Sequence, residues 1–270
     1  MMGKERIDVL LFNQGLASSR EEAKRLIMAG LVYHGTEKVD KPGTKITMDA
    51  ILTVKGALHP YVSRGGLKLA KAIEAFSLSF EDKIVLDVGA STGGFTDCAL
   101  QHGACFVYSL DVGYGQLAWS LRTDQRVKVM ERTNFRYADP DWFDPRPQIA
   151  VMDVSFISIT KLFAKLKEIL IPEAMIVTLV KPQFEAGVEA VAKGGIVRDK
   201  AIHLQVIQDV VQKARDVGWQ ANGITFSPIR GGDGNIEFLL WLTSQDGTSF
   251  PQITQKDITD VVELAHQLAQ

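Results

Sequence analysis

Four ionisable side chains lie in short motifs next to apolar segments, and their types suit proton transfer. The four are Lys68, Asp153, Lys181 and Glu237. Asp153 and Lys181 each follow a strand-like apolar run, where a charge is costly to bury unless it is paired or functional. Two lysines and two carboxylates can neutralise one another. A lysine becomes a base when burial or a second cation lowers its pKa. The set therefore predicts either a proton-transfer site or an internal ion-pair network.

A glycine-rich turn lies between the first two of these residues, in the sequence IVLDVGASTGGF. The apolar strand Ile84–Val88 runs into three glycines, which let the backbone approach a ligand closely. Asp111 follows the next apolar run and can bind ribose hydroxyls. The spacing D-x-G-x-x-x-G-G departs from the dinucleotide fingerprint G-x-G-x-x-G, whose glycines serve a pyrophosphate. It favours S-adenosylmethionine, which has a sulfonium and no phosphate; a nicotinamide site or a structural turn are the alternatives. The predicted cofactor contacts are Asp87, Gly89, Ser91, Gly93, Gly94, Phe95, Asp111, Asn134 and Asp153.

The elements that must position these residues alternate between strand-like and helical segments from Lys83 onward. The predicted strands are Ile84–Val88, Phe106–Asp111, Val127–Glu131, Ile149–Val154, Met175–Lys181, Ala221–Ser227 and Glu237–Thr243. The predicted helices are Phe95–His102, Gln116–Leu121, Ile159–Leu170 and Lys200–Val217. Such alternation is typical of a mostly parallel sheet covered on both faces, with ligands beyond the carboxyl ends of its strands. The predicted fold class is α/β, a Rossmann-like methyltransferase sheet of about seven strands, with a small α+β domain in front.

The front of the chain predicts two helices followed by short strands. Ser19-Arg-Glu-Glu22 has the capping-box form and opens a helix that runs to Gly30. The pattern G-L-A-x-S-R-x-x-A-x-x-L-I-x-x-G-x-V resembles the small RNA-binding fold first seen in ribosomal protein S-four, over residues 5–56. That resemblance implies an RNA-facing surface at Arg20, Lys24 and Arg25. A helix that merely packs onto the larger domain is the alternative.

The net charge of −2 hides an uneven distribution. Residues 1–72 carry 12 Lys and Arg against 7 Asp and Glu, whereas residues 73–270 carry 18 against 25. A basic front module suits phosphates, and an acidic second part suits a cationic cofactor. A solvated charged face is the less specific interpretation.

The length allows one large core and a small extra module. The S-four-like pattern, the linker-like residues and the cofactor turn together predict an RNA-binding domain over residues 1–58, a linker over 59–66 and a methyltransferase domain over 67–270. Apolar runs such as Phe238–Leu242 are far shorter than the roughly 20 residues that span a bilayer. Charged residues near the start interrupt a secretory signal, so we expect a cytoplasmic location and no membrane. Cys98 and Cys105 lack the spacing of a metal site; we expect both to be buried and no metal to be bound.

The motifs around the four ionisable residues carry a wider resemblance. They read SRGGLK, MDVSF, LVKPQF and GNIE. The set is similar to the Lys-Asp-Lys-Glu tetrad of FtsJ-like ribose methyltransferases, and with the front domain the whole chain resembles the TlyA family, often labelled hemolysin-like. The resemblance implies methyl transfer from S-adenosylmethionine to the ribose 2′-hydroxyl of cytidine in ribosomal RNA, with ribosomal subunits as partners. We expect Lys181 to take the hydroxyl proton, Lys68 to be the second cation, and the carboxylates to orient both. The predicted RNA contacts are Arg6, Arg20, Lys24, Arg25, Arg64, Arg132 and Arg136.

Other functions fit the sequence less well. Asp153-Val-Ser-Phe156 lacks the two prolines of amino-group methyltransferases, and neither cysteine stands where a carbon-5 enzyme needs its nucleophile. An inactive RNA-binding or ribosome assembly factor would not need the whole tetrad. A membrane-active cytolysin would need spanning segments that the sequence does not offer. The sequence leaves open the ribosomal subunit, the nucleotide and the oligomeric state.

Overall fold

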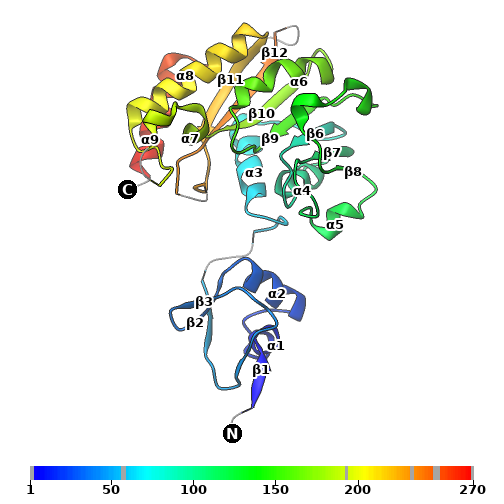
Figure 1. Cartoon of the computed structure of the whole chain (residues 1–270), viewed down its shortest axis with the longest axis vertical. Coiled ribbons are helices and arrows are strands. Elements are labelled where there is room, and N and C mark those ends of the chain that lie inside the picture. The colour runs from blue at the N-terminus through cyan, green and yellow to red at the C-terminus, as the bar shows by residue number, and fades with distance from the viewer. Residues whose placement is uncertain (1–2, 56–58, 192–193, 232–233, 246–249, 269–270) are drawn as a thin grey trace. The chain divides into compact units, whose positions relative to one another are not determined.

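The chain divides into two compact units, Met1–Pro60 and Tyr61–Gln270 (Figure 1). The computed structural model describes residues 3–55, 59–191, 194–231, 234–245 and 250–268. The predicted domain boundary at residue 58 lies outside these described residues. The predicted linker is divided between the units, and its residues 61–66 belong to the second.

The first unit packs two helices against short antiparallel strands. The helices are α1 (Ile7–Asn13) and α2 (Arg20–Met28); the strands are β1 (Lys4–Arg6), β2 (Val32–His34), β3 (Glu37–Val39), β4 (Lys45–Thr47) and β5 (Leu52–Val54), paired as β1-β4 and β3-β2-β5. Helix α2 begins where predicted, because the Ser19 side chain accepts a hydrogen bond from the backbone N–H of Glu22. The Glu22 carboxylate binds Ser18 instead of closing the predicted box. Ile7, Leu11 and Ile27 are buried in the core of this unit.

The second unit is built on a seven-stranded sheet, which confirms the predicted α/β fold. Its order is β11-β12-β10-β9-β6-β7-β8. The strands are β6 (Ile84–Val88), β7 (Phe106–Leu110), β8 (Val127–Met130), β9 (Ile149–Met152), β10 (Met175–Val180), β11 (Trp219–Phe226) and β12 (Phe238–Ser244). Strands β10, β9, β6, β7 and β8 run parallel, and β12 is antiparallel to both of its neighbours.

Helices cover both faces of this sheet (Figure 1). One face packs against α3 (Gly65–Phe76), α4 (Gly94–Gln101) and α5 (Trp119–Arg122); the other packs against α6 (Phe163–Ile169), α8 (Lys200–Asp216) and α9 (Gln255–Gln267). A short helix, α7 (Pro182–Glu185), follows β10, and 3₁₀ turns lie at Phe135–Tyr137, Pro140–Trp142, Ile159–Lys161 and Val188–Ala190. Burial on both faces explains why the parallel strands are continuous apolar runs.

The sequence prediction missed the helices α3, α7 and α9, and its expectation for one cysteine was wrong. Helix α3 opens on Gly65 and Gly66, which read as linker residues, and α9 begins with a capping box at Thr254. The expectation that both cysteines are buried was wrong: Cys98 is buried but Cys105 is exposed, just before β7. Its position at a strand entrance rather than inside the strand leaves its thiol on the surface.

Candidate active site

The four predicted catalytic residues meet at one edge of the sheet. Strands β9 and β10 are parallel, with Met152 opposite Thr178, so Asp153 and Lys181 emerge at the same edge. Strand β12 runs the other way, with Phe238 opposite Val180. The start of β12 therefore lies beside the end of β10, which places Glu237 at the same edge of the sheet as Lys181.

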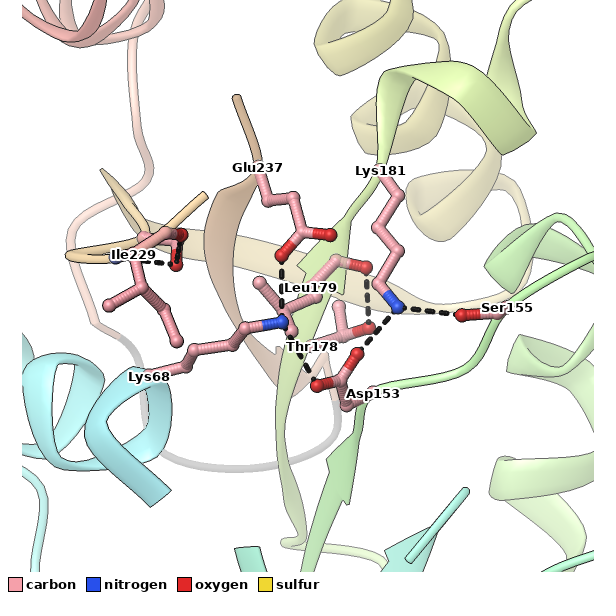
Figure 2. Close-up of polar contacts among 9 residues, drawn as sticks. Lys68, Asp153, Ser155, Thr178, Leu179, Lys181, Ile229 and Glu237 are labelled. Atoms are coloured by element: carbon pink, nitrogen blue, oxygen red, sulfur yellow. Dashed lines mark hydrogen bonds and ion pairs between the residues drawn. The ribbon is translucent and has the colours of Figure 1, made fainter. Parts of the chain in front are cut away.

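The side chains form a chain of ion pairs, with Asp153 between the two lysines (Figure 2). Lys68, on the first turns of α3, places its Nζ 2.7 Å from Glu237 Oε2 and 3.1 Å from Asp153 Oδ2. The other oxygen of Asp153, Oδ1, lies 2.6 Å from Lys181 Nζ. Lys181 Nζ also donates to Ser155 Oγ at 2.9 Å. Two positive and two negative charges thus balance within one buried cluster.

Mutual attraction outweighs the cost of burying these charges. The side chains of Lys68, Lys181 and Glu237 are 9%, 8% and 3% exposed. Burial alone would lower the pKa of Lys68, but the charges of Asp153 and Glu237 raise it above its ordinary value. Burial alone would raise the pKa of Asp153, but the two lysines hold it below its ordinary value. Both groups therefore stay charged at neutral pH.

The glycine-rich turn takes the backbone conformation that its glycines predict. Gly89 and Gly93 have φ angles of 86° and 98°. A Cβ atom at Gly89 would lie 3.0 Å from the Asp153 carbonyl oxygen, so the turn and the Asp153 strand end approach too closely for a side chain. Asp111 closes the turn from the next strand: its carboxylate accepts the backbone N–H groups of Ser91 at 2.8 Å and Gly113 at 2.6 Å.

The N-terminus of α4, which begins at this turn, packs against the start of α3. A Cβ at Gly94 would lie 2.3 Å from Ser63 Oγ and 2.8 Å from the backbone nitrogen of Gly66. A glycine at this position is therefore needed for the two helix starts to approach each other.

Asp87, a predicted cofactor contact, lies beneath the turn. Its Oδ2 accepts a hydrogen bond from Thr96 Oγ1 at 2.7 Å, and Thr96 also pairs with Ser109. Complete burial raises the pKa of Asp87 to about 7, against the lowering effect of the Thr96 hydrogen bond. Its Oδ1 atom is buried without a hydrogen-bond partner among the described residues.

Two cavities meet at the tetrad and the turn. We call the first the tetrad cavity; it has a volume of about 640 Å³ and is lined by all four tetrad residues. We call the second the turn cavity; it has a volume of about 360 Å³ and is lined by Asp111 and Asn134. Both volumes fall in the range of small-molecule sites. The residues shared by both linings are Gly89, Ser91, Asp153, Ser155 and Phe156.

Two of the other predicted cofactor residues, Gly94 and Phe95, line the tetrad cavity. Gly93 and Asp87 line neither cavity. Gly93 instead packs against Leu121, which a Cβ there would meet at 2.3 Å. These assignments as cofactor contacts stay predictions.

Four residues at the cavities were not predicted, although each lies in a motif quoted above. Phe156 is 91% exposed, has a φ angle of 65° and packs its ring 5.2 Å from that of Phe184. A positive φ is unusual for a bulky residue and is often found at functional positions. Ser155 contacts Lys181, and Gln183 lines the tetrad cavity with Phe184. The signal available in the sequence was their place two or three residues after a tetrad residue that follows a strand.

Basic residues of the second unit surround the cavities. Arg64 and Arg230 line the tetrad cavity. Arg136 lines the turn cavity, and the guanidinium of Arg132 lies 4.0 Å from the ring centroid of Tyr114. Of the glycine-rich loop that follows Arg230, Gly232 and Asp233 lie outside the described residues.

Basic residues of the first unit are partly neutralised. Arg6 and Arg20 both bind the buried carboxylate of Asp8, at 2.9 Å and 3.2 Å. Lys24 pairs with Glu21 at 2.7 Å, and the side chain of Arg25 is exposed. Two members of the predicted RNA-facing surface, Arg20 and Lys24, thus carry ion pairs within this unit. An RNA role for these residues stays a prediction.

The described part of the chain contains no cluster of three or more His, Cys, Asp or Glu side chains that could hold a metal ion. Within the same residues, no helix combines the length and apolarity needed to cross a bilayer.

Comparison with known proteins agrees with the geometry. The FtsJ-like methyltransferase family matches residues 61–244, and the S4 domain matches residues 5–52. A candidate rRNA methyltransferase of Bacillus subtilis, YqxC, is 54% identical over 98% of this chain and 95% of its own. The 16S/23S rRNA (cytidine-2′-O)-methyltransferase TlyA of Mycobacterium tuberculosis is 41% identical over 98% of both chains. A solved structure from Streptococcus thermophilus, titled as a candidate hemolysin, shares 50% identity with a TM-score of 0.77, and covers 99% of this chain and 97% of its own.

A seven-stranded sheet with a glycine turn, a buried tetrad and two joined cavities defines an α/β enzyme of the methyltransferase class. The chain belongs to the FtsJ-like methyltransferases with an S4 domain, the TlyA family. The resemblance predicted from the motifs is confirmed.

Proposed function

We propose that this protein transfers a methyl group from S-adenosylmethionine to the ribose 2′-hydroxyl of a cytidine in ribosomal RNA, in the cytoplasm. The observation that carries the proposal is the buried tetrad at the junction of two cavities, with Lys181 facing both Asp153 and Ser155. A cofactor in one cavity and a nucleotide in the other would meet at these side chains. The names of the relatives supply the choice of ribosomal RNA and cytidine.

The turn cavity fits the cofactor. The carboxylate of Asp111, which has no cationic partner among the described residues, lines this cavity, so it suits a cationic ligand and opposes a pyrophosphate. Gly89 leaves room where a side chain would collide with the Asp153 strand end. Asp111 and Asn134 are placed to hold the adenosine part. When bound, S-adenosylmethionine supplies an electrophilic methyl group on a positively charged sulfur.

The tetrad provides proton transfer and alignment. A ribose hydroxyl is too weak an acid to ionise at neutral pH, so a base must take its proton as the oxygen forms its new bond to carbon. We assign this role to Lys181 Nζ, which has to release its own proton before it can accept one. Asp153 holds Lys181 and Lys68 on its two oxygens, and Glu237 holds Lys68 from the other side. Rigid ion pairs of this kind fix the base in one position, and alignment supplies a large part of the acceleration.

The tetrad cavity suits a nucleotide. The rings of Phe156 and Phe184 offer an aromatic surface of the kind on which RNA-binding proteins stack unpaired bases. Arg64 and Arg230 add positive charge for the RNA backbone. The S4 domain supplies a second RNA-binding module, which supports a structured RNA as the substrate.

The test is methyl transfer to separated ribosomal subunits from a strain that lacks the modification. Purified protein and tritiated S-adenosylmethionine are incubated with each subunit, and the labelled nucleotide is mapped by mass spectrometry. We expect label on a cytidine 2′-oxygen, and a loss of at least roughly 1,000-fold in turnover for Lys181→Ala, because a general base and its alignment are both removed. Cofactor affinity, measured by calorimetry, should stay within about 3-fold, since Lys181 does not line the turn cavity.

Label at a base nitrogen or carbon would contradict the proposed reaction. Cofactor binding with no transfer to either subunit or to naked RNA would identify the inactive RNA-binding factor instead. Full activity of Lys181→Ala would remove this residue from the mechanism.

A further inference from the structure

Two chain segments that begin with tetrad residues meet along the tetrad cavity. We call the first, residues 153–159, the Phe156 loop; the second, residues 181–185, contains α7. Each contributes one aromatic ring to the cavity lining, and the centroids of the Phe156 and Phe184 rings are 5.2 Å apart. The contacts that join the two segments therefore decide where this aromatic surface stands.

The tetrad joins the two segments at their first residues. Lys181 Nζ lies 2.6 Å from Asp153 Oδ1 and donates to Ser155 Oγ at 2.9 Å (Figure 2). Both contacts lie on the N-terminal side of Phe156. They leave the far end of the Phe156 loop to be fixed by other groups.

Glu185 joins the two segments at their last residues. Its Oε2 accepts a hydrogen bond from the hydroxyl of Ser158 at 2.6 Å, and its Oε1 accepts the backbone N–H of Ile159 at 2.9 Å. Both oxygens of one carboxylate are thus used on the C-terminal side of Phe156. The loop cannot move away from α7 at this end without breaking two hydrogen bonds.

Phe156 needs support from both sides. Its side chain is 91% exposed, so burial in the core does not hold it in place. Its φ angle of 65° is unfavourable for a bulky residue, and such a conformation persists only where the surrounding contacts impose it. The tetrad supplies those contacts before Phe156, and Glu185 supplies them after it.

We propose that Glu185 is a positioning residue for the target nucleotide: it fastens the Phe156 loop to α7 and thereby keeps the Phe156 and Phe184 rings together as one wall of the tetrad cavity. The inference rests on the proposed function, in which these rings receive the unpaired base. A base that enters the cavity then meets a surface that is already formed, so binding does not have to order the loop. Glu185 acts through Phe156 and does not touch the reacting atoms.

The experiment is a double-mutant cycle of Glu185→Met and Phe156→Ala. The quantity measured is kcat/KM for the ribosomal subunit that is methylated, at saturating cofactor, because Phe156 also lines the turn cavity. Phe156→Ala should lower kcat/KM by roughly 10-fold to 100-fold, since stacking of a base on an aromatic ring is lost. Glu185→Met keeps the side-chain length but breaks both hydrogen bonds, and should lower kcat/KM by at least roughly 5-fold. In the Phe156→Ala background the same change should have an effect of less than about 2-fold, because the ring it positions is absent.

Two further variants show whether the hydrogen bonds are responsible. Glu185→Gln should stay within about 3-fold of the wild-type kcat/KM, because its amide oxygen can accept the Ile159 N–H and its NH₂ group can donate to the Ser158 hydroxyl. Glu189→Met is the matched control, since Glu189 is an exposed residue one turn further along the chain, and it should leave kcat/KM unchanged.

A second measurement does not depend on methyl transfer. Chymotrypsin cleaves after exposed aromatic residues, and the rate of cleavage between Phe156 and Ile157 is followed by mass spectrometry. Cleavage should be at least roughly 5-fold faster in Glu185→Met than in the wild-type protein and in Glu185→Gln, because local opening of the loop exposes its backbone to the protease. If the thermal midpoint shows that Glu185→Met does not fold, Ser158→Ala, which removes one of the two hydrogen bonds from the other side, should give the same pattern at a smaller size.

Three outcomes overturn the proposal. Wild-type kcat/KM together with wild-type cleavage in Glu185→Met shows that the loop does not depend on this residue. An equal loss in the wild-type and Phe156→Ala backgrounds shows that Glu185 acts on something other than the aromatic ring. A loss in Glu185→Gln as large as that in Glu185→Met shows that the two hydrogen bonds are not the cause. Absence of any transfer by the wild-type protein is instead a failure of the proposed function, and it is recognised before a variant is tested.

Discussion

The two cavities at the carboxyl edge of the sheet are built in different ways. The turn cavity is lined by the glycine turn at Gly89 and by the chain segments that follow the neighbouring strands, which include Asp111 and Asn134. The tetrad cavity draws its four charged residues from segments that are far apart in the chain. The first depends on backbone shape and the second on charge balance. Substitutions in the glycine turn should therefore weaken cofactor binding, whereas substitutions in the tetrad should lower both the turnover rate and the free energy of unfolding.

The largest effect on stability should come from Lys68→Met. The substitution leaves Glu237 and one oxygen of Asp153 without their cation in a site where Glu237 is 3% exposed. Removing one partner of a buried pair typically costs about 3–5 kcal/mol, because the other charge stays buried. We expect the free energy of unfolding of the second unit to fall by at least about 3 kcal/mol in urea titrations.

The double variant Lys68→Met with Glu237→Leu is the control for charge balance. It removes one positive and one negative charge, and Asp153 keeps Lys181. Its stability should return to within about 1 kcal/mol of the wild-type value, while turnover stays lost. A double variant that is less stable than Lys68→Met would show that packing, not charge balance, holds this part of the site together.

A smaller and different effect is expected from Gly89→Ala. The residue needs a φ angle of 86°, and the new Cβ would lie 3.0 Å from the Asp153 carbonyl oxygen. The dissociation constant for S-adenosylmethionine, measured by calorimetry, should rise by roughly 10-fold or more, because strain and displacement together cost about 1–3 kcal/mol. Gly35→Ala is the matched control: its φ is 62° but its Cβ would meet nothing within 4 Å. Equal cofactor binding by Gly89→Ala and Gly35→Ala would contradict the close approach seen here.

The smallest predicted effect is a pH dependence of stability that comes from His203, which lies behind the segment of the tetrad cavity around Gly195. Nε2 of buried His203 donates a hydrogen bond to the Val197 carbonyl at 3.2 Å, so Nδ1 of the neutral ring accepts one from His266 Nε2 at 2.9 Å. Asn235 accepts the Val197 N–H with its Oδ1 and donates to the Gly195 carbonyl with its Nδ2. Gly195 lines the tetrad cavity. Burial lowers the pKa of His203 to about 4, with a further lowering by His266.

Because the pKa of His203 is lower in the folded chain, His203 binds a proton in the unfolded chain at pH values where it stays neutral in the folded chain. The free energy of unfolding therefore falls as the pH drops from about 6.5 to about 4. We expect the thermal midpoint to fall by roughly 2–4 °C over this range from this group. His203→Gln, which cannot titrate, should lose part of that dependence; His102→Gln is the control. An unchanged acid slope in His203→Gln would assign the slope to other groups, since Asp153, with its lowered pKa, loses its contribution only below about pH 4.

Local patterns predicted the strands of the second unit well. Buried parallel strands are short apolar runs bounded by turns, and Ile84–Val88 was predicted with its observed bounds. Helix α3 was missed because Gly65 and Gly66 are typical of a linker. Those glycines are needed for a tertiary reason: a Cβ at Gly66 would lie 2.4 Å from the Tyr61 ring, and Gly94 leaves no room for one at the helix contact. No local pattern contains that information.

The sequence by itself determined the kind of site: a glycine turn after a buried strand, two lysines, two carboxylates and the S4-type front module. These signals are local, because backbone conformation and residue type are read over a few neighbouring positions. Only the tertiary structure decided that Asp153 bridges both lysines and that the reversed direction of β12 brings Glu237 to the same edge. Strand direction and burial are set by the packing of the whole sheet, so residues far apart in the chain become one site only when that sheet forms.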